Sequence, residues 1–203
     1  MRDRVLTWLA AHVPAKRRQH ILGVEQTAAA LAEHYGLPVA QAAQAGLLHD
    51  LAKYFKPERL LAIAHTEGWE LDPILVEHPH LLHADASAVI ARDEFGIGDA
   101  EILAAIRNHT LGQPGMSELS CVVYVADAIE PGRGDDPALV ALRQVCWQSL
   151  PQAVWRVADY SLQHLLAHNR PIHLRTVLTR NWALAQARPE RETLRKDRGA
   201  AQP

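Results

Sequence analysis

The sequence has little cysteine, little net charge and no long apolar run. Its two cysteines, Cys121 and Cys146, lie far apart, each within an apolar helical stretch, so we expect core thiols in a reducing compartment. The formal net charge of -2 provides no general basic field, so we expect no DNA or RNA partner. No apolar run approaches the roughly 20 residues of a membrane span, so we expect no membrane partner either.

Further absences bear on location and fold class. The N-terminus lacks a signal-peptide pattern, so we expect a cytoplasmic protein. No segment alternates in the manner of a β-strand and no internal repeat appears, which predicts an all-α fold. With 203 residues and 48% hydrophobic content, we expect a single helical domain over residues 1–187. Residues 188–203 are charged and carry no apolar stripe, so we expect a disordered polar tail there.

Apolar residues at helical spacing, punctuated by proline and glycine, predict a series of helices. The first two are expected over residues 2–12 and 18–35. The third begins near Pro38 and continues through His49, Asp50 and Lys53. Segment 56–79 contains several helix breakers and is expected to form short helices and loops. The remaining helices are expected over 81–95, after the cap residues Asp99 and Ser117, from Pro137, from Pro151, and over 174–187.

Several of these helices continue an apolar face with polar residues. His49, Asp50 and Lys53 follow Ala42 and Gly46 at the spacing of one helix face, because residues three and four apart are neighbours on a helix. Burying such groups is costly unless they are paired with each other or bound to a cation. The His-Asp pair alone is equally consistent with an ordinary hydrogen-bonded pair, since buried polar groups usually find partners.

Six polar residues on apolar faces, from five predicted helices, form a candidate metal site. Imidazole and carboxylate ligands suit iron, manganese, cobalt or zinc. Structural zinc sites are usually rich in thiolates, so the set indicates a catalytic site. Six ligands exceed what one metal with open positions uses and suit two metals sharing a bridging carboxylate, for which Asp50 is the natural choice. Taken singly, each of these residues is also explained as a core histidine or a salt-bridged carboxylate. The six are His20, His49, Asp50, His83, His109 and Asp127.

The order His, His-Asp, His, His, Asp resembles that of the HD superfamily of metal-dependent phosphohydrolases. The sequences of the individual motifs resemble one branch of that superfamily more specifically, the YqeK-type symmetrical diadenosine tetraphosphatases. The resemblance extends from about residue 17 to about residue 187. The segments that carry it are HILGV (20–24), AGLLHDLAK (45–53), NHT (108–110), MS (116–117), ADAIEPGR (126–133), PIHLRT (171–176) and RNWA (180–183).

This resemblance implies an HD-domain helical bundle with a metal site in its core. It implies symmetrical hydrolysis of diadenosine tetraphosphate, a small dinucleoside polyphosphate, to two ADP. It also implies two divalent metals, most naturally iron, with manganese or cobalt as alternatives. His20, His49, Asp50 and Asp127 would hold one ion, and Asp50, His83 and His109 the other. Asp50 and Lys53 are the expected catalytic residues, and a homodimer is a further expectation. The candidate substrate contacts are Lys53, Arg133, Thr110, Arg17 and Arg18.

Three other functions fit parts of the same pattern. The first alternative is an HD-type phosphohydrolase that acts on a nucleoside triphosphate, a cyclic nucleotide or a guanosine alarmone. A catalytically silent HD module that binds nucleotide is a second alternative, and the intact set of six ligands with Lys53 argues against it. A di-iron oxidase on the same scaffold is a third. Lys53 and Arg133 favour phosphate chemistry over oxidation, because both side chains bind phosphate oxygens.

Overall fold

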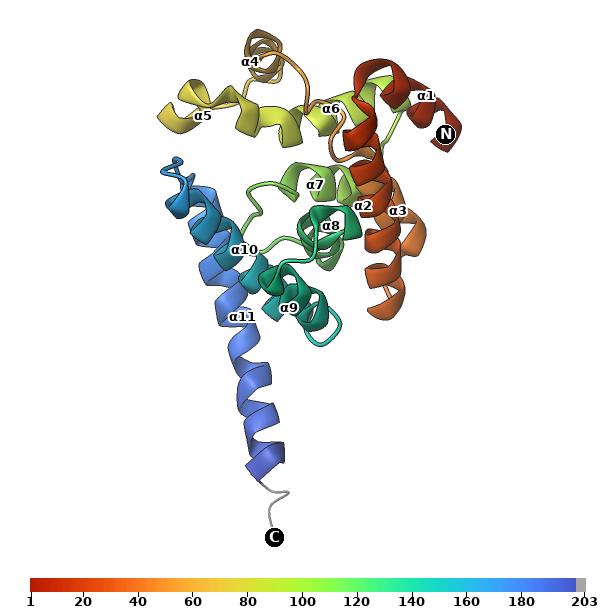
Figure 1. Ribbon diagram of the computed structural model, residues 1–203. Coiled ribbons are helices and arrows are strands. Elements are labelled where there is room, and N and C mark those ends of the chain that lie inside the picture. Colours follow the sequence, from red (N-terminus) through yellow and green to blue (C-terminus); the bar gives the residue numbers. More distant parts are fainter. Residues whose placement is uncertain (200–203) are drawn as a thin grey trace.

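The computed structural model describes the backbone of residues 1–199 and the side chains of residues 1–187. Over this part the chain forms helices and no strand, which confirms the predicted all-α class (Figure 1). No described helix combines the length and apolar character needed to cross a bilayer. The elements are α1 (Arg2–His12), α2 (Ala15–His34), α3 (Val39–Leu48), α4 (Pro57–Thr66), α5 (Pro73–Glu77), the 3-10 turn η1 (Pro79–Leu82), α6 (His83–Phe95), α7 (Ala100–Asn108), α8 (Glu118–Ile129), the 3-10 turn η2 (Pro131–Arg133), α9 (Pro137–Val145), α10 (Leu150–Ala167) and α11 (Leu174–Gly199).

Side-chain caps begin several helices where the sequence predicts them. The Asp99 carboxylate accepts from the amides of Glu101 and Ile102 at the start of α7. Ser117 caps α8 through the Ser120 amide. Asp136 caps α9, whose first residue is Pro137. These caps satisfy amides that have no partner within the helix, so the local sequence alone sets each boundary.

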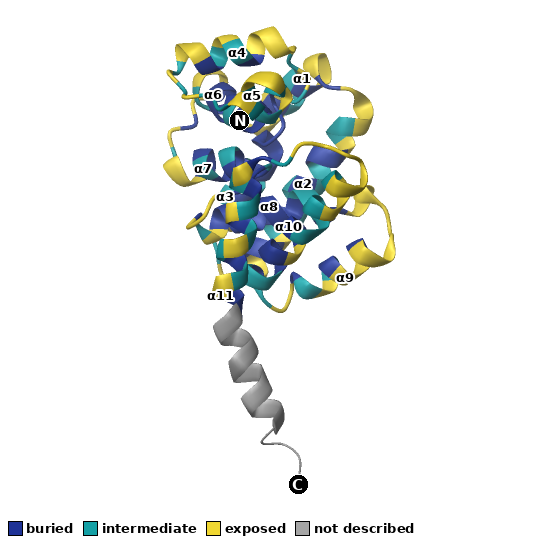
Figure 2. Ribbon diagram, turned by 90° about the vertical axis from the view of Figure 1, so that its left-hand side faces the viewer, coloured by how far each residue is buried: buried dark blue, intermediate teal, exposed yellow. Residues whose placement is uncertain are grey.

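Helix α8 is the centre of the bundle. Its sequence is apolar on all sides, and its residues from Leu119 to Ala126 are buried. Helices α2, α3, α7 and α10 pack around it, as the dark core of Figure 2 shows. A smaller core lies under α4 and joins it to η1 and α6 through Leu60, Ala64 and Leu82. The segment that looked least regular in the sequence therefore has its own hydrophobic contacts.

Several predicted helix boundaries differ from the structure: α2 begins at Ala15 rather than at residue 18, α6 begins at His83 rather than at residue 81, and two further differences are larger. The prediction that the third helix continues through Lys53 is wrong, because α3 ends at Leu48 and residues 49–54 form turns. The His49 Nδ1–H donates to the carbonyl of Gly46 at 2.6 Å, and a continued helix would use that carbonyl for the amide of Asp50. At the other end of the chain, α11 runs to Gly199 rather than ending near 187. The predicted disordered tail over residues 188–203 lies where no side chain is described, so it stays a prediction, as does the single domain over 1–187.

Helices α2 and α3 approach each other closely at Gly46. A Cβ added there would lie 3.0 Å from the Glu25 Cα and 3.0 Å from the Val24 carbonyl oxygen, both backbone atoms of α2. Backbone atoms of a packed helix cannot rotate aside as a flexible side chain would. The absence of a side chain at residue 46 therefore sets how near α3, with the His49-Asp50 pair at its end, lies to α2.

We expect Gly46→Ala to lower the free energy of unfolding by roughly 1 kcal/mol, measured by urea denaturation. Overpacking costs about 1–3 kcal/mol, and the higher helix propensity of alanine returns about 1 kcal/mol of this. Gly98→Ala is the matched control, because a Cβ at Gly98 meets nothing within 4 Å. Equal stability of the two variants would show that the close approach of α2 and α3 does not depend on Gly46.

Candidate metal centre

The structure brings all six predicted residues to one place in the core. His20 lies on α2, His49 and Asp50 follow α3, His83 begins α6, His109 follows α7, and Asp127 lies on α8. His49, Asp50, His83 and His109 are each at most 3% exposed. Asp127 is half-buried, at 21% side-chain exposure. Residues far apart in the sequence therefore form one polar cluster inside an otherwise apolar bundle.

One side of each imidazole is anchored to the protein. The Nδ1 atoms of His49, His83 and His109 donate to the carbonyls of Gly46, His80 and Ile106, three residues earlier, at 2.6–2.7 Å. A carbonyl oxygen only accepts, so the proton of each ring lies on Nδ1. The Nε2 atom of each neutral ring then carries a lone pair, and it is the Nε2 atoms that face one another across the cluster. Donation from one ring nitrogen to an anchor is the usual arrangement of a metal-binding histidine.

The two oxygens of Asp50 face different histidines. Oδ2 lies 3.5 Å from the His49 Nε2 atom, whereas Oδ1 lies 3.4 Å from that of His83 and 3.6 Å from that of His109. The His49 Nε2 and Asp50 Oδ1 atoms are buried and have no hydrogen-bond partner. Buried polar atoms without partners are costly, so this geometry calls for a cation among them.

The donor atoms form two trios that suit a divalent metal. His20, His49 and Asp50 make one trio and Asp50, His83 and His109 the other, with the ligand atoms of each within 4.8 Å of one another. In the second trio the Nε2 atoms of His83 and His109 lie 3.2 Å apart, where two lone pairs would repel. Burial lowers the pKa of His83 to about 4 and also lowers that of His109. Both rings are therefore neutral near pH 7, the form that binds metal.

Asp127 is held between a histidine and an arginine. Its Oδ1 atom lies 3.0 Å from the His20 Nε2 atom and 3.7 Å from the His49 Nε2 atom. The Arg133 guanidinium donates to the same oxygen at 2.5 Å. Burial works to raise the pKa of the Asp127 carboxyl, but His20 and Arg133 outweigh it and hold the pKa well below its usual range. Asp127 is therefore a carboxylate that meets the first trio.

Most of the predicted substrate contacts lie at the cluster. The Lys53 ammonium donates to the His83 Nε2 atom at 3.1 Å, and the Thr110 hydroxyl lies 3.1 Å from the same atom. The Arg17 guanidinium lies 3.1 Å from Asp50 Oδ2. Arg18 differs from the prediction, because its guanidinium donates to the Ala10 and Val13 carbonyls at 3.1 Å. It satisfies carbonyls at the C-terminal end of α1 and does not face the cluster.

Glu130 belongs to the cluster although the sequence analysis did not select it. Its Oε1 atom accepts from the His20 Nδ1 atom at 2.8 Å, and Oε2 accepts from the Gly132 amide at 2.6 Å. A Cβ added at Gly23 would lie 2.5 Å from Oε2, so the absence of a side chain there leaves room for the carboxylate. The signal was present in the sequence, where Glu130 follows Asp127 by one helical step.

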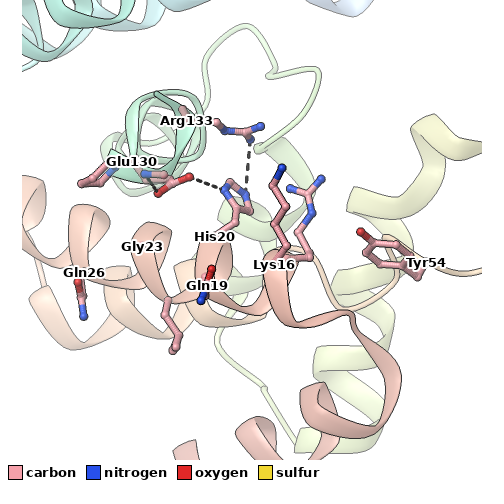
Figure 3. A pocket seen from close by; sticks show the side chains of 12 residues that line it. Lys16, Gln19, His20, Gly23, Gln26, Tyr54, Glu130 and Arg133 are labelled. Atoms are coloured by element: carbon pink, nitrogen blue, oxygen red, sulfur yellow. Dashed lines mark hydrogen bonds and ion pairs between the residues drawn. The ribbon is translucent and has the colours of Figure 1, made fainter. Parts of the chain in front are cut away.

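Two cavities open beside the cluster. The first, about 650 Å³, is lined by His20, Arg17, Lys16, Tyr54 and Arg133, and Figure 3 shows Lys16, His20 and Arg133 close together with Tyr54 facing them. The second, about 430 Å³, lies between η1, α8, α10 and α11. It is lined by Thr110, Asp127 and Arg133 and by apolar residues that include Leu111, Tyr160 and Leu165. Arg133 lines both cavities.

Comparison with known proteins gives a consistent result. Residues 17–132 match the family model described as HD domain. A Bacillus subtilis protein named symmetrical bis(5'-nucleosyl)-tetraphosphatase is 35% identical over 185 residues, which cover 91% of this chain and 98% of that one. A protein of the same name from Halalkalibacterium halodurans is 34% identical with the same coverage.

A solved structure is similar as well. It is a Clostridium acetobutylicum protein described as a predicted HD superfamily hydrolase involved in NAD metabolism, with a TM-score of 0.87 and 34% sequence identity over 91% of this chain and 97% of that one. The family resemblance seen in the motifs is thereby confirmed. The chain belongs to the HD-domain family, in the group that includes the symmetrical bis(5'-nucleosyl)-tetraphosphatases.

Proposed function

We propose that this protein hydrolyses diadenosine tetraphosphate symmetrically to two ADP. The observation that carries the proposal is the buried cluster of four histidines with Asp50 and Asp127, bordered by three cationic side chains that a polyphosphate would engage. Relatives of near-equal length that bear the tetraphosphatase name support the choice of substrate. A silent module would have no need to keep every member of this cluster.

We further propose that the cluster holds two divalent transition metals, with iron as the first choice and manganese or cobalt as alternatives. His20, His49, Asp50 and Asp127 would hold one ion, and Asp50, His83 and His109 the other. The separate orientation of the two Asp50 oxygens supports its role as the shared ligand. When bound, such a pair of ions activates water at neutral pH and neutralises charge on the phosphate oxygens.

Three cationic residues beside the cluster share one proposed task. Lys53, Arg17 and Arg133 each face a carboxylate or a histidine of the cluster, and together they would neutralise the phosphates of the substrate. Burial lowers the pKa of Lys53, whereas Asp50 and Asp127 act to raise it. The Lys53 amine lies beside the His83 Nε2 atom and would donate to an incoming phosphate. Water adds to one of the two central phosphorus atoms, the bond to their bridging oxygen breaks, and each half leaves as ADP.

We also propose a cytoplasmic location for the protein. Cys121 and Cys146 are both free thiols in the interior, which supports the proposed cytoplasmic location. A homodimer stays an expectation from the family resemblance. The substrate partner is proposed to be a small dinucleoside polyphosphate, recognised by the cationic residues of the cluster rather than by an extended basic surface.

We expect metal-loaded protein to convert diadenosine tetraphosphate to ADP as the sole nucleotide product, resolved by ion-exchange chromatography. Elemental analysis of the same sample should find about two transition-metal ions per chain.

Asp50→Ala should lose metal and turnover while the far-ultraviolet circular dichroism stays helical, because Asp50 faces both trios. Formation of ATP with AMP would contradict symmetrical cleavage, and full activity of the Asp50 variant would contradict the shared-ligand role.

Lys53→Met should retain both metals and the fold but lose about ten- to a hundred-fold in kcat/KM for the dinucleotide. Charge-assisted hydrogen bonds of this kind contribute roughly 1.5–3 kcal/mol. Lys56→Met is the matched control, because Lys56 is exposed. Steady-state kinetics and metal analysis of both variants decide the matter. If the Lys53 variant behaves like the Lys56 variant, Lys53 takes no part in binding phosphate.

Glu130→Ala should weaken metal binding about 10–100-fold, measured by competition with a chelator. The carboxylate orients His20 by accepting from its Nδ1 atom, so its removal leaves the ring free to turn. Glu67→Ala is the control, because Glu67 makes an ion pair with Arg92. A purely structural role for Glu130 would instead lower the melting temperature and leave the metal affinity unchanged.

A further inference from the structure

Both cavities reach the metal centre, and they share Arg133 as a lining residue. Residues that touch the cluster line both of them: Arg17 and His20 belong to the first cavity, and Thr110 and Asp127 to the second. Arg133 lines both cavities and binds Asp127. A molecule that passes the centre can therefore place one end in each cavity.

The two cavities differ in chemistry but each suits a nucleoside. The first has the cations Lys16 and Arg17 near the cluster and an aromatic ring, Tyr54, at its edge. Tyr54 is 52% exposed, and Figure 3 shows it beyond Lys16, on the side away from His20. Aromatic rings in such positions serve as platforms on which bases stack. The second cavity is walled by Leu111, Leu165 and other apolar side chains, which suit the flat face of a purine.

We propose that the two cavities hold the two nucleosides of one substrate molecule, with Tyr54 as the base platform of the first cavity. This assignment rests on the proposed function. Diadenosine tetraphosphate has two equal halves, so one nucleoside in each cavity places the middle of the polyphosphate chain at the junction, beside Arg133 and the histidine cluster. Cleavage into two equal products then follows from where the nucleosides are held. A site with a single nucleoside cavity would not select the central bond in this way.

The test measures binding of a diadenosine tetraphosphate analogue in which a methylene group replaces the central bridging oxygen, by calorimetry on the metal-loaded protein. Tyr54→Ala removes the platform of the first cavity. Ser161→Trp fills the second cavity from a half-buried position on α10. Each should raise the Kd of the analogue about tenfold or more, the size of loss that removing a base–aromatic stack causes. Tyr54→Phe keeps the ring and should restore the affinity.

Two comparisons make the test specific. Trp147→Ala is the control, because Trp147 is also exposed, at 43%, and lines neither cavity. ADP has one nucleoside and binds in whichever cavity has the higher affinity for it. At most one of the two cavity variants should therefore raise the Kd of ADP, whereas both should raise the Kd of the analogue. Conversion of the true substrate to ADP by the wild-type protein tests the proposed function separately. With that conversion intact, an unchanged Kd for the analogue in either folded, metal-loaded cavity variant overturns the two-cavity assignment.

Discussion

A carboxylate buried among imidazoles is the constraint on which the rest of the molecule depends. Asp50 is 2% exposed, and an isolated charge at that depth would be prohibitively unfavourable. Arg17 and the histidines that surround it come from α2, α6, the end of α3 and the end of α7. These segments must therefore pack together for the charge to be tolerated. The apolar faces of the same helices supply the driving force, so the packing of the core and the geometry of the site depend on each other.

The ends of helices explain how such a cluster is built. The last carbonyls of a helix have no amide partner within it, and each can accept a hydrogen bond from an imidazole three residues on. His49 and His109 both use this device, directly after α3 and α7. This hydrogen bond occupies a carbonyl at the end of the helix and also fixes the orientation of the ring. The same hydrogen bond thus accounts for both the position of the ligand and the end of the helix.

The sequence predicts the helices whose ends carry local signals and fails where tertiary contacts decide. Asp99, Ser117 and Asp136 begin helices as predicted, because a cap needs only its own next residues. The six site residues could be collected because polar groups on apolar faces are rare. The sequence does not predict the end of α3, because the His49 Nδ1–H competes with a backbone amide as donor to the Gly46 carbonyl. It does not predict the position of Arg18 either, because the acceptors of that side chain, the carbonyls of Ala10 and Val13, lie at the end of α1. Glu130 was passed over because a pattern along one helix does not reveal the glycines opposite.

The space around Glu130 has a consequence for how substitutions near it combine. Gly23 on α2 and Gly132 on η2 each leave room for the same carboxylate, since a Cβ at either would lie within 3.0 Å of its Oε2 atom. Once a methyl group at one position has displaced Glu130, a methyl group at the other has little left to disturb. The two glycines are therefore energetically coupled through Glu130. The effects of substituting them on the free energy of unfolding should not be additive. Gly23, Glu130 and Gly132 therefore act as one energetic unit.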